Sequence, residues 1–440
     1  MVKLTGAAVL ALTLIQCGSD MTTKEAAATD VVWATNIGGG AVLASDGVHY
    51  GAEEGVSGGA IRTLQSIKGS QDPVLYQSYR HGDIRVAKAL PNGRYDVVLH
   101  FAEPDEVGGG ERVFDVLING RRRIADLDVM AWRDGKIKSG LTVAASDVAV
   151  DDGELLIEFE AQAGEPVLSA VVVRRRAGRN DDWRLVWQDE FDYEGAPDPA
   201  KWTHDIWRPK KVNDEDQYYT DRAKNVRVEN GHLVIEAHRE EFEGAEYTSG
   251  RIHTAGKGDF LYGRFEIRAK TPRGQGTWPA IWMLPSDPYK YSTTCEPGED
   301  WQGSETCDAW PNSGEIDILE HVGYQMGHVH GTVHNRAYYW VNWEQRKGRI
   351  IEPTVDTEFH VYALEWHEDR IDIFVDDTLY FTYVNEGTGW EAWPYDHPFH
   401  LIINIAMGGV WGRAGGPTDD SQLPQQFLID YVRVFEKATS

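Results

Sequence analysis

Residues 314–321 read Gly-Glu-Ile-Asp-Ile-Leu-Glu-His, a short run in which polar and apolar side chains alternate. Successive side chains of a β-strand point to opposite faces. The alternation therefore predicts a strand with Glu315 and Asp317 on one face and the two isoleucines in the core. In a regular strand Glu320 would point to the opposite face, because it lies an odd number of residues from Glu315 and Asp317. A single-residue bulge at Leu319 would return it to the face of the other two carboxylates.

Three carboxylates in one row suggest acid–base chemistry. Like charges this close cannot all stay ionised at low cost, so at least one pKa rises and an acid then lies beside a base. Retaining glycoside hydrolysis uses such a pair, a nucleophilic carboxylate and a protonated carboxyl roughly 5–5.5 Å apart. A solvated strand face or a calcium-binding patch would give the same pattern, so the motif alone leaves these alternatives open.

Alternating runs of the same kind recur along the chain, bounded by Gly, Asn, Asp and Pro, and no helical periodicity is sustained. The clearest runs are residues 95–101, 112–118, 155–159, 167–173, 264–269, 361–366, 371–375 and 427–434. Their density predicts an all-β protein with two β-sandwich domains.

The composition excludes two broad classes of protein. The chain has 43 Lys and Arg against 70 Asp and Glu, with a formal net charge of −27. A surface of this sign repels phosphate, so nucleic acid is excluded as a partner. Hydrophobic residues make up 41% of the sequence, which is enough for a buried core and excludes wholesale disorder.

The N-terminus carries export signals. A short basic start is followed by an apolar run, residues 7–15, that is too short to span a bilayer and predicts a signal peptide. Residues 14–17 resemble a bacterial lipoprotein box, in which Cys17 would be acylated. We therefore expect a lipid-anchored outer-membrane or cell-surface protein, with ordinary secretion as the alternative.

The chain divides into five segments. We expect a lipoprotein-type signal peptide over 1–17, a flexible tether over 18–30, a first domain over 31–173, a charged linker over 174–182 and a second domain over 183–438. In an oxidising compartment, Cys295 and Cys307 are expected to form a disulfide. We expect the protein to act as a monomer.

The second domain resembles glycoside hydrolase family 16, specifically its laminarinase-like endo-β-1,3-glucanases, whose fold is a concave β-jelly roll. The motifs that carry the resemblance are residues 249–253 (Ser-Gly-Arg-Ile-His), 278–285 (Trp-Pro-Ala-Ile-Trp-Met-Leu-Pro), 314–321, 330–334 (His-Gly-Thr-Val-His), 404–412 (Asn-Ile-Ala-Met-Gly-Gly-Val-Trp-Gly) and 430–434 (Asp-Tyr-Val-Arg-Val). The resemblance covers the whole second segment.

The resemblance implies a role for each carboxylate. Glu315 is expected to be the nucleophile, Glu320 the general acid/base and Asp317 the residue that orients Glu315, in a double displacement that retains the anomeric configuration. The expected substrate is an internal β-1,3 bond of a laminarin-like glucan. The residues expected to bind it are Asn213, Arg251, Trp278, Trp282, Trp310, His334 and Trp411.

Two metal alternatives arise. His328, His330 and His334 have the same parity and could hold zinc, although structural or substrate contacts fit their surroundings better because no further ligand completes a site. The resemblance also implies one structural calcium, at the positions of Glu190, Gly231 and Asp430. It implies no cofactor for catalysis.

Residues 31–173 resemble a malectin-like carbohydrate-binding domain. The resemblance rests on residues 36–39 (Asn-Ile-Gly-Gly), 46–50 (Asp-Gly-Val-His-Tyr), 99–103 (Leu-His-Phe-Ala-Glu) and 112–120. Tyr50, Tyr76 and Tyr79 are its candidate glucan contacts, and a spacer role is the alternative.

Other functions remain open from the sequence. The second domain could cut mixed-linkage glucan, agarose, carrageenan or porphyran, whose hydrolases share the bulged acidic motif. The whole chain could instead be a glycan-binding surface lipoprotein without catalysis.

Overall fold

The computed structural model describes residues 30–133, 135–176 and 183–438. The predicted signal peptide, Cys17 and nearly all of the tether lie outside these residues, as does the linker from 177 to 182. Within the described ranges, no helix combines the length and apolar character needed to cross a membrane.

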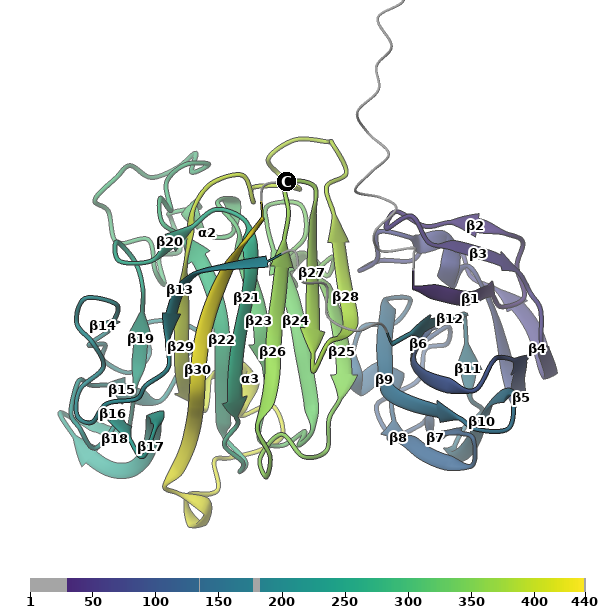
Figure 1. The fold of residues 1–440 in the computed structure, drawn as a ribbon, viewed down its shortest axis with the longest axis horizontal. Coiled ribbons are helices and arrows are strands. Elements are labelled where there is room, and N and C mark those ends of the chain that lie inside the picture. Colours follow the sequence, from purple (N-terminus) through teal and green to yellow (C-terminus); the bar gives the residue numbers. More distant parts are fainter. Residues whose placement is uncertain (1–29, 134, 177–182, 439–440) are drawn as a thin grey trace, which may run out of the picture.

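The first domain is a sandwich of two β-sheets (Figure 1). One sheet has the strand order β9 (Gly140–Val150), β6 (Gly93–Ala102), β12 (Ala170–Arg175), β1 (Val31–Asn36), β3 (His49–Ala52) and β2 (Val42–Leu43). The other has the order β11 (Val167–Leu168), β5 (Ser78–Ala89), β10 (Glu154–Ala163), β7 (Val113–Ile118) and β8 (Arg121–Leu127), with β4 (Val56–Thr63) paired to β5. Two short helices, η1 (Pro73–Tyr76) and α1 (Val129–Trp132), complete it.

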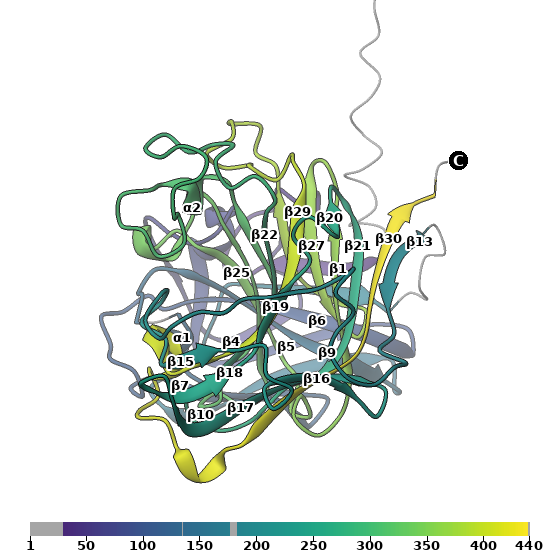
Figure 2. The same cartoon turned by 90° about the vertical axis from the view of Figure 1, so that its left-hand side faces the viewer.

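The second domain is a jelly roll of two larger sheets (Figures 1 and 2). The site-bearing sheet has the order β14 (Thr203–His204), β19 (Arg251–His253), β29 (Phe399–Met407), β22 (Thr277–Pro285), β23 (Glu315–Glu320), β24 (His328–His334) and β25 (Arg346–Ile351), with β20 (Asp259–Phe260) paired to β29. The opposite sheet has the order β15 (Gln217–Tyr219), β18 (Ala245–Ser249), β17 (His232–Phe242), β30 (Gln425–Lys437), β21 (Gly263–Lys270), β26 (His360–Trp366), β27 (Arg370–Val375) and β28 (Thr378–Val384), with β13 (Trp183–Asp189) on β30 and β16 (Val226–Glu229) on β17. The short helices are α2 (Ala309–Asn312), η2 (Trp340–Asn342), α3 (Gly409–Gly412) and η3 (Asp420–Gln422).

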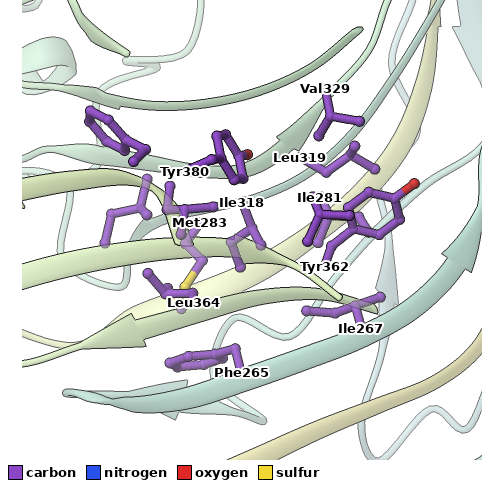
Figure 3. Close-up of a cluster of buried hydrophobic side chains, with 14 of the residues drawn as sticks. Phe265, Ile267, Ile281, Met283, Ile318, Leu319, Val329, Tyr362, Leu364 and Tyr380 are labelled. Atoms are coloured by element: carbon purple, nitrogen blue, oxygen red, sulfur yellow. The ribbon is translucent and has the colours of Figure 1, made fainter. Parts of the chain in front are cut away.

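The core of the second domain lies between its two sheets (Figure 3). Alternate residues of each strand point inward, so Phe265 and Ile267 of β21 share one buried cluster with Ile281 and Met283 of β22. Ile318 and Leu319 are both fully buried there, although they are consecutive on β23. Two consecutive inward side chains require an irregularity in that strand.

The two domains share a β-sheet. β25 of the second domain runs parallel to β9 of the first, with Arg349 opposite Val143. The sheet of the first domain is consequently covered on both faces, by its own second sheet and by β28, which contributes Tyr380 and Phe381. This explains the continuous apolar run 171–173, because a strand buried on both faces needs no polar alternation.

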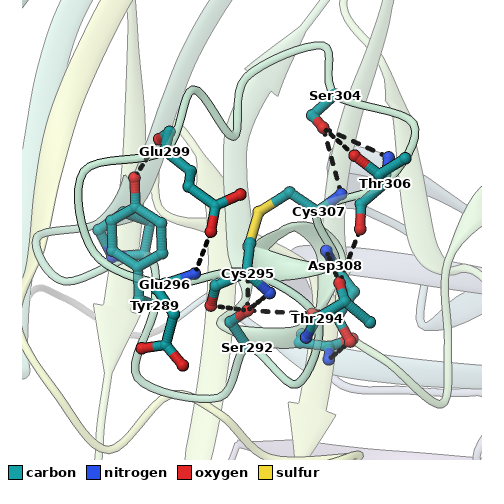
Figure 4. Close-up of a disulfide and its surroundings, with 12 residues drawn as sticks. Tyr289, Ser292, Thr294, Cys295, Glu296, Glu299, Ser304, Thr306, Cys307 and Asp308 are labelled. Atoms are coloured by element: carbon teal, nitrogen blue, oxygen red, sulfur yellow. Dashed lines mark hydrogen bonds between the residues drawn. A yellow bond between two sulfur atoms is a disulfide. The ribbon is translucent and has the colours of Figure 1, made fainter.

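The predicted disulfide between Cys295 and Cys307 is present and closes a loop ahead of β23 (Figure 4). Both cysteines pack with Ala309 in a small cluster of their own. Asp308 accepts hydrogen bonds from the backbone of Thr293 and Thr294, at 2.8 and 3.0 Å. The loop thus has a defined structure next to the acidic strand.

Candidate active site

The acidic strand β23 contains the predicted bulge, one residue earlier than expected. Asp317 lies opposite Trp282 of β22, and Leu319 lies opposite Ile281, which leaves Ile318 as the extra residue. The bulge shifts the alternation by one, so all three carboxylates share a face. The position of the extra residue could not be read from the sequence, because Ile318 and Leu319 are equally apolar.

Each of the two outer carboxylates receives a hydrogen bond from a tryptophan. The indole Nε1 of Trp310 donates to Glu315 Oε2 at 3.1 Å, and that of Trp278 donates to Glu320 Oε1 at 3.1 Å. Asp317 shares a hydrogen bond with Glu315. Both outer carboxylates therefore have a fixed orientation on the open face of the sheet.

The electrostatics of the row favour retention of a proton. Burial raises the pKa of Glu315, and the charge of Glu320 raises it further, whereas the Trp310 hydrogen bond lowers it. Burial, followed by the charges of Glu315 and Glu320, raises the pKa of Asp317 well above its usual range. Asp317 therefore keeps its proton near neutral pH and donates it to Glu315, which remains the hydrogen-bond acceptor.

His334 lies opposite Glu315 on β24. Its Nε2 is 3.7 Å from Glu315 Oε1 and 3.6 Å from Asp317 Oδ2. Burial lowers its pKa to about 3, with further contributions from the positive charges of Lys347 and Lys136. His334 is therefore a neutral neighbour of the carboxylates at ordinary pH.

The four predicted tryptophans are all partly exposed on this face. Trp278 and Trp310 bond the carboxylates, and Trp411 stands edge-on to Trp278, with ring centroids 5.5 Å apart. Trp282 lies opposite Asp317 in the pairing of β22 with β23, and its Nε1 donates to Asn404 Oδ1 of β29 at 2.7 Å. The structure thus brings Trp278 and Trp310 onto the two glutamates, Trp411 against Trp278, and Trp282 beside Asp317 on the neighbouring strand.

Arg251 lies beside Trp282. Its guanidinium stands between the indoles of Trp207 and Trp282, 4.3 and 4.7 Å from the ring centroids. Its Nε donates to Asp205 Oδ2 at 2.7 Å. Asp205 and Trp207 were not anticipated from the sequence, because they come from a loop that matches none of the quoted motifs.

A buried carboxylate, Glu215, was also missed. It accepts hydrogen bonds from the side chains of Asn213 (3.4 Å), Gln217 (2.7 Å) and Tyr219 (3.2 Å). Burial raises its pKa. Asn404 donates to the Tyr219 hydroxyl at 3.1 Å and so links this cluster to Trp282. Asn213, which we predicted to bind sugar, therefore has a partner within the protein as well.

The three histidines of β24 do not converge on one point. His328 lies 4.4 Å from the Trp132 ring, His330 lies 5.0 Å from the Trp411 ring, and His334 faces the carboxylates. A shared zinc site is therefore not supported by their positions.

Comparison with known proteins agrees with this geometry. The model of glycosyl hydrolases family 16 matches residues 213–433, and a malectin domain model matches residues 31–171. A beta-glucanase from Rhodothermus marinus is 50% identical over 266 residues, which cover 59% of this chain and 87% of that protein. The chain belongs to glycosyl hydrolases family 16. It is a glycoside hydrolase, and the resemblance predicted from the sequence is confirmed for both domains.

Two further relatives support the family assignment. The solved structure of the laminarinase from Rhodothermus marinus has a TM-score of 0.52 and 51% identity, covering 58% of this chain and 97% of that one. Glucan endo-1,3-beta-glucosidase A1 from Niallia circulans is 35% identical over 286 residues, 58% of this chain and 38% of that protein. Each match covers little more than the second domain of this family 16 enzyme.

At the calcium position predicted for this family 16 enzyme, the two acidic side chains form ion pairs with arginines. Both carboxylate oxygens of Glu190 accept hydrogen bonds from Arg433 at 2.8 Å, and Asp430 Oδ2 accepts one from Arg268 at 2.6 Å. Calcium at Glu190, Gly231 and Asp430 stays a prediction.

The tyrosines predicted as glucan contacts of the first domain are buried. Tyr50 and Tyr76 are each 3% exposed, and Tyr79 is 5% exposed. The hydroxyls of Tyr50 and Tyr76 both bond the His100 ring at 3.0 Å, on the face that the second domain covers. Tyr50 and Tyr76 therefore do not present a sugar-binding surface, because the second domain covers them. The predicted glucan contact of Tyr79 stays a prediction.

Proposed function

We propose that this enzyme hydrolyses internal β-1,3-glucosidic bonds of laminarin-like glucans with retention of configuration. The observation that carries the proposal is the row Glu315, Asp317 and Glu320, in which Trp310 orients the first carboxylate and Trp278 the last. The names of the relatives support the substrate class, since they include a laminarinase and a glucan endo-1,3-beta-glucosidase.

In the first chemical step, Glu315 attacks the anomeric carbon while Glu320 transfers its proton to the leaving glycosidic oxygen. The carbon–oxygen bond to the leaving sugar breaks, and an ester forms between the anomeric carbon and Glu315. In the second step, Glu320, now a carboxylate, takes a proton from water. The water oxygen attacks the anomeric carbon, the ester bond breaks, and Glu320 is protonated again.

Asp317 acts on the nucleophile rather than on the sugar. Its proton is shared with Glu315, and this hydrogen bond, together with that from Trp310, orients the carboxylate for attack. When the ester forms, Glu315 loses its charge, and the electrostatic reason for the raised pKa of Asp317 becomes weaker. Asp317 thus tunes the charge of Glu315 between the two steps.

Substrate choice is tested by the product profile on laminarin, mixed-linkage glucan, agarose and carrageenan. The expected result is rapid release of oligosaccharides of mixed length from laminarin, as an endo-acting enzyme produces. Turnover of agarose or carrageenan with none of laminarin would overturn the β-1,3-glucan assignment and leave the glycosidase chemistry intact.

We also propose that the enzyme is exported and lipid-anchored through Cys17. The apolar run 7–15 and the following lipoprotein-type box support this. Metabolic labelling with a fatty acid is expected to label the full chain in a bacterial host and not the Cys17→Ser variant. Equal labelling of both would contradict the anchor, and release of unlabelled protein would indicate plain secretion.

A further inference from the structure

The catalytic strand lies close to the domain border. In the shared sheet, β23 is followed by β24, β25 and then β9 of the first domain. Neighbouring strands lie about 4.8 Å apart, so the first domain begins roughly 14 Å from β23. Only a few sugar units fit over that distance.

The direction of the substrate follows from the two catalytic carboxylates. Glu315 and Glu320 occupy the two ends of β23, and in a retaining enzyme such residues flank the scissile bond. A polysaccharide that passes between them crosses the strands instead of following them. In one direction it runs over β22 towards Arg251, and in the other it runs over β24 and β25 towards the first domain.

The first domain reaches the β24–β25 hairpin through α1 and the loop that follows. Arg349 of β25 donates to the Trp132 carbonyl at 3.1 Å, with its guanidinium 4.7 Å from the Trp132 ring centroid. At the other end of the hairpin, Lys136 Nζ donates to the Trp340 carbonyl at 3.3 Å. Lys136 is close enough to the active site to contribute to the low pKa of His334.

The turn between β24 and β25 presents two exposed indoles. Trp340 is 48% exposed and Trp343 is 51% exposed, so both are among the most exposed large apolar side chains of the described residues. We call these two residues the tryptophan ledge. The neighbouring Tyr339 stands edge-on to Trp310, with centroids 5.9 Å apart, and Trp310 bonds the nucleophile. Ring contacts therefore connect the nucleophile to Tyr339, the residue that directly precedes the ledge in the sequence.

The ledge has a fixed structure. Asn342 accepts a hydrogen bond from the Tyr339 backbone at 3.2 Å and donates to the Ala337 carbonyl at 2.7 Å. From the first domain, the Gly69 backbone donates to Glu344 at 3.0 Å, and Lys136 Nζ lies 5.8 Å from the Trp343 ring centroid. Exposed apolar side chains held this firmly are typical of a binding surface.

We propose that the tryptophan ledge binds glucosyl units beyond the cleavage site, and that the first domain positions the ledge through Lys136. The flat indole faces suit the apolar faces of pyranose rings. The occupant is the glucan chain itself, because the ledge lies on the turn between β24 and β25, the two strands that the chain crosses after it leaves the catalytic carboxylates, and directly follows Tyr339, whose ring contacts Trp310. The inference rests on the proposed β-glucan hydrolysis and gives the first domain a part in substrate binding without a sugar site of its own.

The test is the dependence of kcat/KM on the length of laminari-oligosaccharides, measured with the full chain. In the wild type, kcat/KM is expected to rise with each added unit until the chain spans the ledge. In the Trp340→Ala/Trp343→Ala double variant, the last rise is expected to disappear, and KM for laminarin is expected to increase roughly three- to tenfold with little change in kcat. Trp183→Ala, which removes a partly exposed indole from β13 on the opposite sheet, is the matched control and keeps the wild-type dependence.

Lys136 is tested as a positioning residue. Lys136→Ala is expected to raise KM for laminarin without lowering kcat, whereas Lys136→Arg is expected to keep the wild-type KM. If the double tryptophan variant keeps the wild-type dependence of kcat/KM on chain length, the proposal that the tryptophan ledge binds glucan is overturned. A wild-type enzyme that does not turn over laminarin would instead refute the proposed function, so the two failures are distinguishable.

Discussion

Trp310 tunes the nucleophile, and replacing it with phenylalanine tests that role. Its indole Nε1 donates to Glu315 Oε2 at 3.1 Å, which lowers the pKa of Glu315 against the effects of burial and of Glu320. Trp310→Phe keeps an aromatic ring of similar shape and removes the donor. Glu315 attacks only when ionised, so its reactivity is lost as the pH falls through its pKa. Raising that pKa moves the acidic limb of the kcat/KM profile to higher pH.

The size of the shift follows from the hydrogen bond. A bond to a charged acceptor contributes about 1.5–3 kcal/mol. One pKa unit corresponds to about 1.4 kcal/mol, so complete loss of the bond would raise the pKa of Glu315 by about one to two units. Water that enters the vacated space recovers part of this, so we expect a shift of about one pH unit.

The assay is the pH dependence of kcat/KM on laminarin for the wild type and for Trp310→Phe. Trp282→Phe is the matched control, because its indole donates to Asn404 and not to a carboxylate. In this control, the acidic limb is expected to coincide with that of the wild type, whatever the change in KM through lost sugar contacts. An unshifted limb in Trp310→Phe would refute the role of this hydrogen bond in tuning Glu315.

Two further predictions concern stability. Cys295→Ser opens the only disulfide of the described residues, a loop with a sequence separation of 12, and is expected to lower the free energy of unfolding by about 3 kcal/mol or less in guanidinium titrations; an unchanged midpoint would show that the loop adds no constraint. Gln71→Ala removes two hydrogen bonds to the backbone of Val384, at 2.7 and 2.8 Å, and is expected to cost about 2 kcal/mol. A Tm equal to that of the wild type would mean that this contact does not hold the domains together.

Much of the catalytic machinery could be predicted from the sequence because it lies in one short strand. The alternation of side chains along a strand places Glu315 and Asp317 on the same face. Glu320 falls on the other face, so a bulge is needed to bring it beside them. The partners of the carboxylates were harder to assign. Trp278 and Trp310 were predicted as sugar contacts, and their hydrogen bonds to Glu320 and Glu315 depend on rotamers that no spacing encodes.

The domain interface could not be predicted, because it joins segments hundreds of residues apart. Tyr50 and Tyr76 have the residue type of a sugar platform, and only the tertiary structure shows that β28 covers them. One signal was available, namely the apolar run 171–173, which is too continuous for a strand with one solvent face.

Glu215 was missed because the sequence of an acidic loop does not distinguish a buried acid from a solvated one.

The most direct test of the double displacement uses the Glu320→Ala variant with an aryl β-laminaribioside, whose leaving group departs without protonation. The ester on Glu315 then accumulates, because no base activates water. Added azide is expected to attack the anomeric carbon, raise turnover roughly tenfold or more, and release the β-glycosyl azide. Turnover that azide leaves unchanged, or an α-glycosyl azide as the product, would contradict the assignment of Glu315 as nucleophile and Glu320 as acid/base.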